Sequence, residues 1–400
     1  IFTDTYDKLI ISTGAKAIVP PIAGASGQNV FTLRNINDMN GIKAYIQTNK
    51  PKTAAIAGTG FIGLEVCENL KELGIEVTLI EKLAQVTPGL DADMAVYVKE
   101  YLEKKGIKVF LSSTVQEITE NTAILSCGRV LPADMVLLST GVCPGTELAV
   151  QAGIELGPTG AIKVDVKMRT NLNDIYACGD CTEQVHLVTG KPVYRPLGST
   201  ANKTGRIAGD CVTGGSLEFR GILGTGIFKI FDMAVAQTGL SEREAKQEGY
   251  EVVVCHNIKP DKPEYMGGKE MIIKGVADKN TGRLLGAQII GYEGVDKRID
   301  VFVTAITFKA KAEDLFHLDL AYAPPFSTTK DPVMYTGMIL ENAINKGRPL
   351  ITAQSLDELI KSDEKHQIID ARAVSQFETN HVDTAVNIPH GKLRKSIDSL

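Results

Sequence analysis

The stretch Thr53–Lys82 reads TAAIAGTGFIGLEVCENLKELGIEVTLIEK, and it decides the fold. An apolar strand expected at Thr53–Ala57 leads into a G-x-G-x-x-G turn that opens a helix, and a second strand at Glu76–Ile80 ends at the acidic Glu81. The glycines of the turn are Gly58, Gly60 and Gly63. A strand, this turn, a helix, a strand and an acidic residue in this order are typical of a dinucleotide-binding βαβ unit.

Each residue of this pattern has an expected role. Gly58 permits the tight turn, Gly60 lets the backbone approach a pyrophosphate, and Gly63 lets the helix and strand pack closely. The phosphate charge would lie against free N–H groups at the helix N-terminus. Glu81 should accept the 2′-hydroxyl of an adenosine ribose and repel a 2′-phosphate, which favours NADH over NADPH, although Lys82 could meet such a phosphate. The alternative is a glycine-rich turn that binds no ligand.

The composition excludes several classes of function. The chain has 400 residues and a net charge of −5, which gives no reason to expect a nucleic acid or an anionic membrane as partner. We find no apolar run of the roughly 18 residues that a membrane span needs. The seven cysteines are scattered and odd in number, which favours a reducing compartment, and therefore the cytoplasm, over a disulfide framework. We expect no metal centre.

A short motif occurs twice. Ser12–Gly14 follows Tyr-Asp-Lys-Leu-Ile-Ile, and Ser139–Gly141 follows Ala-Asp-Met-Val-Leu-Leu, so the same Ser-Thr-Gly ends an apolar strand in both places. The matching contexts indicate two related nucleotide-binding modules. In the second module strands and helices alternate from Thr53 to Leu138, which predicts a parallel sheet covered by helices.

The pattern changes after this module. Residues 145–215 hold a strand that ends at Gly179-Asp180 and a helix over about 196–213. From about 217 to 346 long strands precede two helices, which predicts an α+β domain. A Gly-Arg-Pro linker then leads to residues 351–400, which begin another α/β unit. Because the first residues read as a buried strand without preceding partners, we interpret the chain as a fragment cut at both ends.

Five motifs follow one another along the chain, namely Ser12–Gly14, Gly58–Glu65, Tyr176–Asp180, Leu197–Arg206 and Leu318–Ser327. In this order they resemble the flavoprotein disulfide reductases that have two dinucleotide-binding domains. The block Leu-Asp-Leu-Ala-Tyr-Ala-Pro-Pro-Phe-Ser at Leu318–Ser327 is most similar to one branch of that family. This branch contains coenzyme A-disulfide reductases and NADH oxidases with a C-terminal rhodanese domain.

The resemblance implies an α/β fold with two Rossmann-like FAD- and NAD-binding modules, an α+β dimerisation domain and the start of a rhodanese-like α/β domain. The FAD-binding module would be incomplete, with its N-terminal half missing, and the rhodanese-like domain would be truncated. The implied domains are FAD-binding at 1–28 and 145–215, NAD(P)H-binding at 29–144, dimerisation at 216–347 and rhodanese-like at 351–400.

The resemblance also implies the cofactor sites. Asp180 would accept a ribitol hydroxyl of FAD, and its alternative is a helix cap. The helix after Ser199 would point its N-terminus at the flavin, and Glu65 would lie beside the nicotinamide or else be a solvated first-turn acid. The implied cofactor-binding residues are Thr13, Gly14, Gly58, Gly60, Gly63, Glu65, Glu81, Gly141, Gly179, Asp180, Ala201 and Phe326. Asn202 and Arg206 would bind substrate.

The coenzyme A branch further implies two catalytic tyrosines that act across a homodimer interface, Tyr322 and Tyr265. A tyrosine hydroxyl can donate a proton to a thiolate leaving group, whereas the alternative for both rings is packing with a wet hydroxyl. In the family the redox cysteine would lie before Ile1, so we expect this chain to be inactive. The first FAD fingerprint would also lie before Ile1, so we expect the purified chain to be colourless. Cys178 and Cys181 form a C-x-x-C, but they bracket the presumed FAD motif and are not expected to replace that cysteine.

The tail has its own expected pair. Asp370 and Arg372 would end a buried strand and brace the sulfur-carrying loop of a rhodanese, which by analogy points to persulfide or polysulfide handling. The alternative is a bare α/β unit in which these two residues form a structural pair.

We therefore expect an FAD-dependent oxidoreductase that passes a hydride from NADH or NADPH through flavin to a thiol/disulfide centre. Its substrate would be coenzyme A disulfide, coenzyme A persulfide or a related polysulfide, and it would act as a cytoplasmic homodimer without nucleic acid or membrane partners. Three alternatives stay open: an NADH oxidase or peroxidase, an electron-transfer flavoprotein, and a non-catalytic nucleotide-binding fragment.

Overall fold

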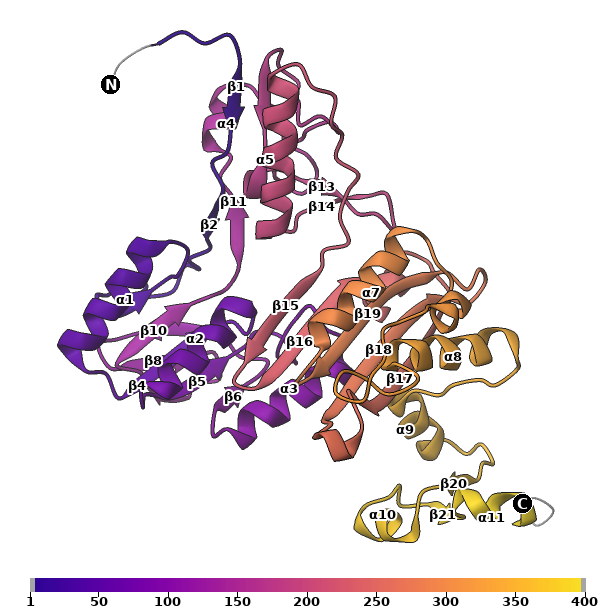
Figure 1. The fold of residues 1–400 in the computed structure, drawn as a ribbon. Coiled ribbons are helices and arrows are strands. Elements are labelled where there is room, and N and C mark those ends of the chain that lie inside the picture. Colours follow the sequence, from indigo (N-terminus) through magenta and orange to yellow (C-terminus); the bar gives the residue numbers. More distant parts are fainter. Residues whose placement is uncertain (1–3, 397–400) are drawn as a thin grey trace. The chain divides into compact units, whose positions relative to one another are not determined.

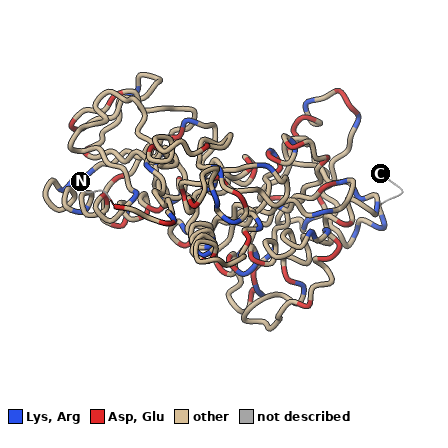
Figure 2. The backbone as a smooth tube through the Cα atoms, turned by 90° about the horizontal axis from the view of Figure 1, so that it is seen from above, with Lys and Arg blue, Asp and Glu red and all other residues tan. Residues whose placement is uncertain are grey.

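The computed structural model describes residues 4–396, and the chain divides into two units, residues 1–350 and 351–400 (Figure 1). Acidic and basic residues are interspersed along both units (Figure 2), as expected for a weakly acidic chain. Among residues 4–396, no helix has the length and apolar character that crossing a membrane requires.

A five-stranded parallel sheet contains the glycine turn. Its strands, in spatial order, are β3 (Val30–Phe31), β10 (Met135–Leu138), β4 (Thr53–Ala57), β5 (Glu76–Ile80) and β6 (Lys108–Phe110). Side chains of a strand alternate between its faces, so Ile56 of β4 enters one core cluster and Ala55 the other. Both faces of this sheet are therefore buried, as parallel sheets require.

The two faces have different covers. Helices α1 (Ile36–Asn49), α2 (Phe61–Glu72) and α3 (Ala92–Lys104) supply Ile42, Leu64 and Met94 to the first cluster. The other face is covered by a small antiparallel sheet whose strands are β7 (Val115–Ile118), β8 (Thr122–Leu125) and β9 (Val130–Pro132). The sequence predicted helices as the cover, and the strands of this small sheet take that role on one face.

A two-stranded ribbon joins this sheet to the next part of the unit. Strand β1 (Leu9–Ile11) pairs in parallel with β12 (Ile175–Ala177), while β2 (Ala15–Ala17) pairs antiparallel with β11 (Val142–Pro144). The two Ser-Thr-Gly motifs directly precede β2 and β11. The chain therefore passes between the two parts of the unit twice, once along each strand of this ribbon (Figure 1). Beyond it lie α4 (Glu147–Gln151), β13 (Gln184–Val185), β14 (Pro192–Val193) and α5 (Gly198–Val212).

The second large sheet is antiparallel and follows the order β15-β16-β19-β18-β17. Its strands are β15 (Gly226–Ile230), β16 (Met233–Gly239), β17 (Val252–Pro260), β18 (Glu270–Asp278) and β19 (Leu284–Gly291). Helices α7 (Val295–Thr307) and α8 (Pro332–Asn345) cover one face through Phe302 and Leu340, and the short α6 (Glu242–Gln247) precedes β17. The opposite face, which includes Val235 and Ile272, joins the core cluster of the first sheet.

A buried lysine ties the two large sheets together. Lys274 on β18 is 0% exposed, and its Nζ lies 2.7 Å from Asp93 Oδ2, 2.7 Å from Glu242 Oε2 and 3.2 Å from Asp91 Oδ2. Asp91 and Asp93 stand at the start of α3, and His256 on β17 also contacts Asp93 at 2.9 Å. Burial alone would raise the pKa of the Asp93 carboxyl, but hydrogen bonds from His256 and Lys274 lower it to about 2.

Residues 351–400 form the second unit. It contains α9 (Ala353–Lys361), α10 (Val374–Thr379), α11 (His390–Ser396) and the parallel strands β20 (Ile368–Asp370) and β21 (Ala385–Asn387). The Arg372 guanidinium lies 2.5 Å from Asp370 and donates a hydrogen bond of 2.7 Å to the carbonyl oxygen of Asn380. The expected Asp370–Arg372 pair therefore stands at the end of β20.

Replacing Lys274 with Met should lower the free energy of unfolding by about 3–5 kcal/mol, because three carboxylates would remain close together without their buried counter-charge. Denaturant unfolding of the purified chain measures this change. Lys279→Met is the matched control, because Lys279 pairs with Glu251 on the surface, where an ion pair contributes about 0–1 kcal/mol. Equal effects of the two substitutions would contradict the importance of the buried cluster.

Acid should weaken the contacts of Asp93 with Lys274 and His256. The folded pKa of Asp93 is about 2, below the value of about 3.9 for an unfolded aspartate, so its stabilisation is present above pH ~4 and is lost as the pH falls toward 2. The loss is about 2 kcal/mol, and Asp93→Asn should flatten the dependence of unfolding free energy on pH across this window. If the unfolding free energy of Asp93→Asn depended on pH in the same way as that of the unsubstituted chain, Asp93 would not be the group that titrates here.

Candidate functional site

The glycine turn lies against the end of β10 without room for side chains at two positions. Gly58 has φ +104°, and a Cβ there would lie 2.3 Å from the carbonyl oxygen of Ser139. A Cβ at Gly63 would lie 2.2 Å from the carbonyl oxygen of Gly58. At Gly60 a Cβ would meet nothing within 4 Å, so this backbone faces open space. The three glycines thus have different physical environments, two packed and one open.

The N-terminus of α2 is free to receive an anion. Its N-cap is Gly60, which has no side chain to cap the helix, and its first turn contains no acidic residue. The first amides therefore remain available, and the helix dipole favours negative charge at this end. Glu65 lies one turn further along the helix on its exposed side, where desolvation and then the nearby Glu68 raise the pKa of its carboxyl.

Glu81 holds the turn in place. Its buried carboxylate accepts hydrogen bonds at Oε2 from Thr59 N (3.0 Å) and Thr59 Oγ1 (2.7 Å), and at Oε1 from Leu83 N (3.0 Å). An ionised acceptor makes stronger hydrogen bonds than a neutral one. Glu81 therefore joins the Gly58–Gly60 turn to the segment that follows β5.

One cavity of about 760 Å³ brings together Gly58, Gly60, Glu81 and Gly141. Thr140 also lines it, and its Oγ1 donates a 2.9 Å hydrogen bond to Ile18 O on the crossing ribbon. Gly63 packs behind the turn and is not part of the lining, and Glu65 lies outside it. The cavity volume is within the usual range for a cofactor site.

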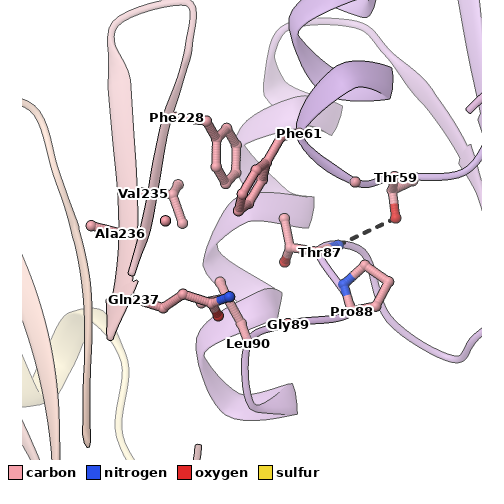
Figure 3. A pocket seen from close by; sticks show the side chains of 12 residues that line it. Thr59, Phe61, Thr87, Pro88, Gly89, Leu90, Phe228, Val235, Ala236 and Gln237 are labelled. Atoms are coloured by element: carbon pink, nitrogen blue, oxygen red, sulfur yellow. Dashed lines mark hydrogen bonds between the residues drawn. The ribbon is translucent and has the colours of Figure 1, made fainter. Parts of the chain in front are cut away.

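A smaller cavity of about 40 Å³ continues from the turn toward the antiparallel sheet (Figure 3). Phe61, the first residue of α2, faces Phe228 of β15 with ring centroids 5.1 Å apart. Thr87 donates a 3.2 Å backbone hydrogen bond to Thr59 Oγ1, and its φ of +48° bends the loop toward the turn. The turn is therefore supported from the second sheet and from the loop at Thr87.

A second group of predicted residues meets around Arg34. The Arg34 guanidinium lies 2.7 Å from Asp180 Oδ2 and donates a 3.2 Å hydrogen bond to the carbonyl oxygen of Ala15, next to Gly14. Among the described residues, none donates a hydrogen bond to the second carboxylate oxygen of Asp180. Gly179 has φ +80°, and a Cβ there would lie 3.8 Å from Ala201 Cβ. Gly14, Gly179, Asp180 and Ala201 are thus neighbours.

Other predicted residues surround this group. Thr13 Oγ1 donates a 2.5 Å hydrogen bond to the carbonyl oxygen of Gly145, which closes the ribbon. The N-cap of α5, Leu197, makes no side-chain cap, so the first amides of α5 can stabilise negative charge. Asn202 and Arg206 are exposed on α5, four residues apart and therefore on the same side of the helix.

The cysteine pair beside Asp180 is buried. Desolvation raises the pKa of the Cys178 thiol, and the Sγ of Cys181 lies 3.2 Å from the carbonyl oxygen of Cys178. A redox-active thiol needs access and a lowered pKa. The geometry agrees with a structural role for this C-x-x-C.

The third group lies on α7 and on loops beside the antiparallel sheet. Tyr322 and Phe326 line a cavity of about 600 Å³ together with Lys262, Lys297 and Arg298. Tyr265 is in the short 3-10 helix Glu264–Met266, and it is not part of that lining. The three groups are separate within the described chain, and only the first two are joined by the β2–β11 ribbon.

Some residues of these sites were missed in the sequence analysis. Arg34 and Thr59 contact predicted site residues directly, at distances of 2.7 Å to Asp180 and 2.7 Å to Glu81. Thr59 lies inside the glycine motif, so its hydroxyl could have been identified from the sequence as a hydrogen-bond donor at this site. Arg34 carries no motif of its own, and its partner lies 146 positions further along the chain.

Two family models match the chain. The model described as pyridine nucleotide-disulphide oxidoreductase matches residues 2–195, and the model described as pyridine nucleotide-disulphide oxidoreductase, dimerisation domain, matches residues 226–332. The second match agrees with the α+β character predicted for this part of the chain.

Named relatives are similar over most of this sequence. A protein of Methanocaldococcus jannaschii named NADH oxidase is 38% identical over 350 residues, which cover 86% of this chain and 77% of that protein. NAD(P)H sulfur oxidoreductase (CoA-dependent) of Pyrococcus furiosus is 38% identical over 342 residues, with coverages of 84% and 77%. Coenzyme A disulfide reductase of Staphylococcus aureus is 33% identical over 338 residues, with coverages of 84% and 76%.

A solved structure is similar over the whole chain. It is the crystal structure of reduced Bacillus anthracis CoADR-RHD, with a TM-score of 0.97 and 37% identity, and the match covers 100% of this chain and 72% of that one. The predicted α/β fold class and the predicted oxidoreductase with FAD and NAD(P)H as cofactors are confirmed. The chain belongs to the pyridine nucleotide-disulphide oxidoreductase family.

Proposed function

We propose that this oxidoreductase reduces coenzyme A disulfide, coenzyme A persulfide or a related low-molecular-weight polysulfide with NADH. The names of two relatives, a CoA-dependent sulfur oxidoreductase and a coenzyme A disulfide reductase, support this substrate class. For a disulfide, NADH and one proton would yield NAD⁺ and two thiols. FAD, when bound, would supply two-electron chemistry between the nicotinamide and the sulfur of the substrate.

The observation that carries the proposal is the short connection between the two cofactor sites. The β2–β11 ribbon has Gly14 at one end, beside the Asp180 turn, and Ile18 and Gly141 at the other, in the lining of the 760 Å³ cavity. Four extended residue steps from Gly14 to Ile18 span roughly 13 Å. A nucleotide and a flavin bound at these ends would therefore be close enough for their reactive rings to meet.

The residues around the first cavity would bind the nucleotide. Amides at the start of α2 would hold the pyrophosphate, for which the open face of Gly60 leaves space. Glu81 would accept the ribose hydroxyl while it retains its hydrogen bonds from Thr59 and Leu83. Its negative charge next to the 2′ position would disfavour NADPH.

The residues around Arg34 would bind the flavin. The second carboxylate oxygen of Asp180 would accept a ribitol hydroxyl, while Arg34 keeps the carboxylate oriented. The uncapped amides of α5 would stabilise negative charge on the flavin ring. Asn202 and Arg206, on the exposed side of α5, would contact the coenzyme A moiety.

We further propose a homodimer in which the substrate site is completed by the partner subunit. The matched dimerisation domain supports association of two chains. Tyr322 and Tyr265 would donate hydrogen bonds and a proton to the leaving thiolate across this interface, and Phe326 would contact the cofactor. The proposed domains are the FAD-binding one at 1–28 and 145–215, the NAD(P)H-binding one at 29–144, the dimerisation domain at 216–347 and a rhodanese-like domain at 351–400.

A second candidate function is NADH oxidation by oxygen, because one relative is named NADH oxidase. The two functions differ in the electron acceptor. With the full-length, flavin-loaded enzyme, NADH consumption that depends on coenzyme A disulfide and releases two thiols supports the reductase, whereas equal consumption with oxygen alone supports the oxidase.

Gly60→Ala should weaken NADH binding without lowering the melting temperature. The added methyl group meets no protein atom, but it fills the space that the pyrophosphate needs, so we expect about a tenfold higher Kd. Gly58→Ala is the contrasting variant, because strain at φ +104° should cost about 1–3 kcal/mol of stability. Calorimetric binding and thermal melts measure both, and a normal Kd for Gly60→Ala would argue against this site.

Glu81→Gln should reduce the preference for NADH. The substitution keeps the shape of the side chain but removes the charge that would repel a 2′-phosphate, so the ratio of kcat/KM for NADH to that for NADPH should fall by about tenfold. Steady-state assays with the two nucleotides measure this ratio. A higher kcat/KM for NADPH in the unsubstituted enzyme would show that the role given to Glu81 is wrong.

In the full-length enzyme, Tyr322→Phe should slow disulfide turnover by about 100-fold, the lower range of general acid catalysis, while flavin reduction by NADH remains unchanged. Tyr335→Phe, on α8 of the same domain, is the matched control. Stopped-flow absorbance separates the two half-reactions. An unchanged kcat for Tyr322→Phe would remove this tyrosine from the mechanism.

A further inference from the structure

The two proposed catalytic tyrosines lie on exposed loops. Tyr265 is 77% exposed and Tyr322 is 47% exposed, so neither ring is held by a surrounding core. A proton donor must nevertheless be placed within hydrogen-bond reach of its acceptor. The position of each hydroxyl therefore depends on what holds the bases of the two loops.

One buried guanidinium contacts both bases. Arg298 on α7 is 1% exposed, and its Nη2 donates a 2.8 Å hydrogen bond to the carbonyl oxygen of Asp261 and a 3.3 Å hydrogen bond to Ser327 Oγ. The same nitrogen lies 3.0 Å from Asp331 Oδ2, and Nη1 donates to the carbonyl oxygen of Gly294 at 3.1 Å. Four residues in three segments of the chain therefore share this single side chain.

Asp261 closes the loop that carries Tyr265. Its backbone N–H donates to the carbonyl oxygen of Lys269 at 2.9 Å, and its Oδ1 accepts from the backbone N–H of Lys269 at 2.7 Å. These two bonds join the ends of the 261–269 segment. Because Arg298 binds the carbonyl oxygen of Asp261, it fixes this closed loop relative to α7.

Ser327 and Asp331 close the loop that carries Tyr322. Ser327 Oγ donates a 2.7 Å hydrogen bond to Asp331 Oδ2, and its backbone N–H donates to the carbonyl oxygen of Ala323 at 3.2 Å. Asp331 also caps α8 by accepting from Val333 N at 3.0 Å. The segment from Ala323 to Ser327 is thus anchored to the start of α8 and, through Arg298, to α7.

We propose that Arg298 is a positioning residue for the disulfide-reducing step, because it holds the Tyr265 loop and the Tyr322 loop in one fixed geometry. This inference rests on the proposed function of the two tyrosines. The planar guanidinium presents several donors in a rigid arrangement, and a lysine ammonium cannot reproduce that set of contacts. Arg298 would act through the loops, because its guanidinium is 1% exposed and its nitrogens are already bonded to protein atoms.

Charge alone does not provide this role. The neighbouring Lys297 lines the 600 Å³ cavity together with Tyr322. Its Nζ lies 3.9 Å from Asp331 Oδ2, beyond hydrogen-bond distance. It therefore supplies a positive charge at the same place without fixing either loop. This makes Lys297→Met a matched control for the loss of charge.

Hydrogen exchange of the purified chain tests the anchoring directly. Arg298→Lys should raise amide exchange in residues 261–269 and 318–331 together by about tenfold or more, which corresponds to the loss of one hydrogen bond to a charged group. Ser327→Ala is a milder second variant, because it removes only one hydroxyl and tests the same contact even where Arg298→Lys fails to fold. It should raise amide exchange in residues 318–331 alone. Lys297→Met should change neither loop. Unchanged exchange in Arg298→Lys, or the same rise in Lys297→Met, would overturn the proposal.

A double-mutant cycle tests the catalytic consequence in the full-length, flavin-loaded enzyme. Arg298→Lys should lower kcat with the disulfide by about tenfold and leave flavin reduction by NADH unchanged, and Tyr322→Phe should have a smaller effect in that background than alone. Fully additive losses would overturn the proposal. If Tyr322→Phe alone has no effect while both loops exchange faster in Arg298→Lys, the catalytic assignment of the tyrosine fails and the anchoring by Arg298 stands.

Discussion

The close approach between the glycine turn and the end of β10 is the constraint on which the rest of the structure depends. Ser139 Oγ donates 3.0 Å hydrogen bonds to the carbonyl oxygens of Ala57 and Gly58, and side chains at Gly58 or Gly63 would overlap the backbone there. This packing directs the uncapped amides of α2 toward the cavity. The contact that lets β4, α2 and β10 fit together therefore also creates the place where an anion can bind.

Each of the three groups of site residues is held by a charged side chain that is bonded to backbone. Glu81 accepts from the amides of Thr59 and Leu83, Arg34 donates to the carbonyl oxygen of Ala15, and Arg298 donates to that of Asp261. Hydrogen bonds that involve an ionised group are stronger than those between neutral groups. Such hydrogen bonds can hold a loop in place, because loops have unpaired backbone groups and bury little apolar surface that would otherwise fix their conformation.

The strands around the glycine turn could be read from the sequence because their signals are local. The bounds of β4 and β5 match the expected ones and β10 ends at the expected Leu138, since each is a short apolar run that ends at a glycine, an acid or a Ser-Thr-Gly. Helix α1 was missed because Ile42 is its only buried residue, so its apolar periodicity is weak. The capping box between Asn35 and Asp38 marks its start and could have revealed it. Strand β9 was missed because only Leu131 of its three residues is buried.

The family, the fold class and the separate glycine, Gly-Asp and tyrosine motifs follow from the order of residues along the chain, because strand periodicity, turn glycines and helix starts are local properties. Which motifs meet depends on folding. The pairing of Arg34 with Asp180 joins residues 146 positions apart, and Arg298 joins loops that lie on both sides of it in sequence. Such contacts leave no periodic signal, since either partner taken alone is an ordinary charged or polar residue, and only the three-dimensional packing brings their charges within hydrogen-bond distance.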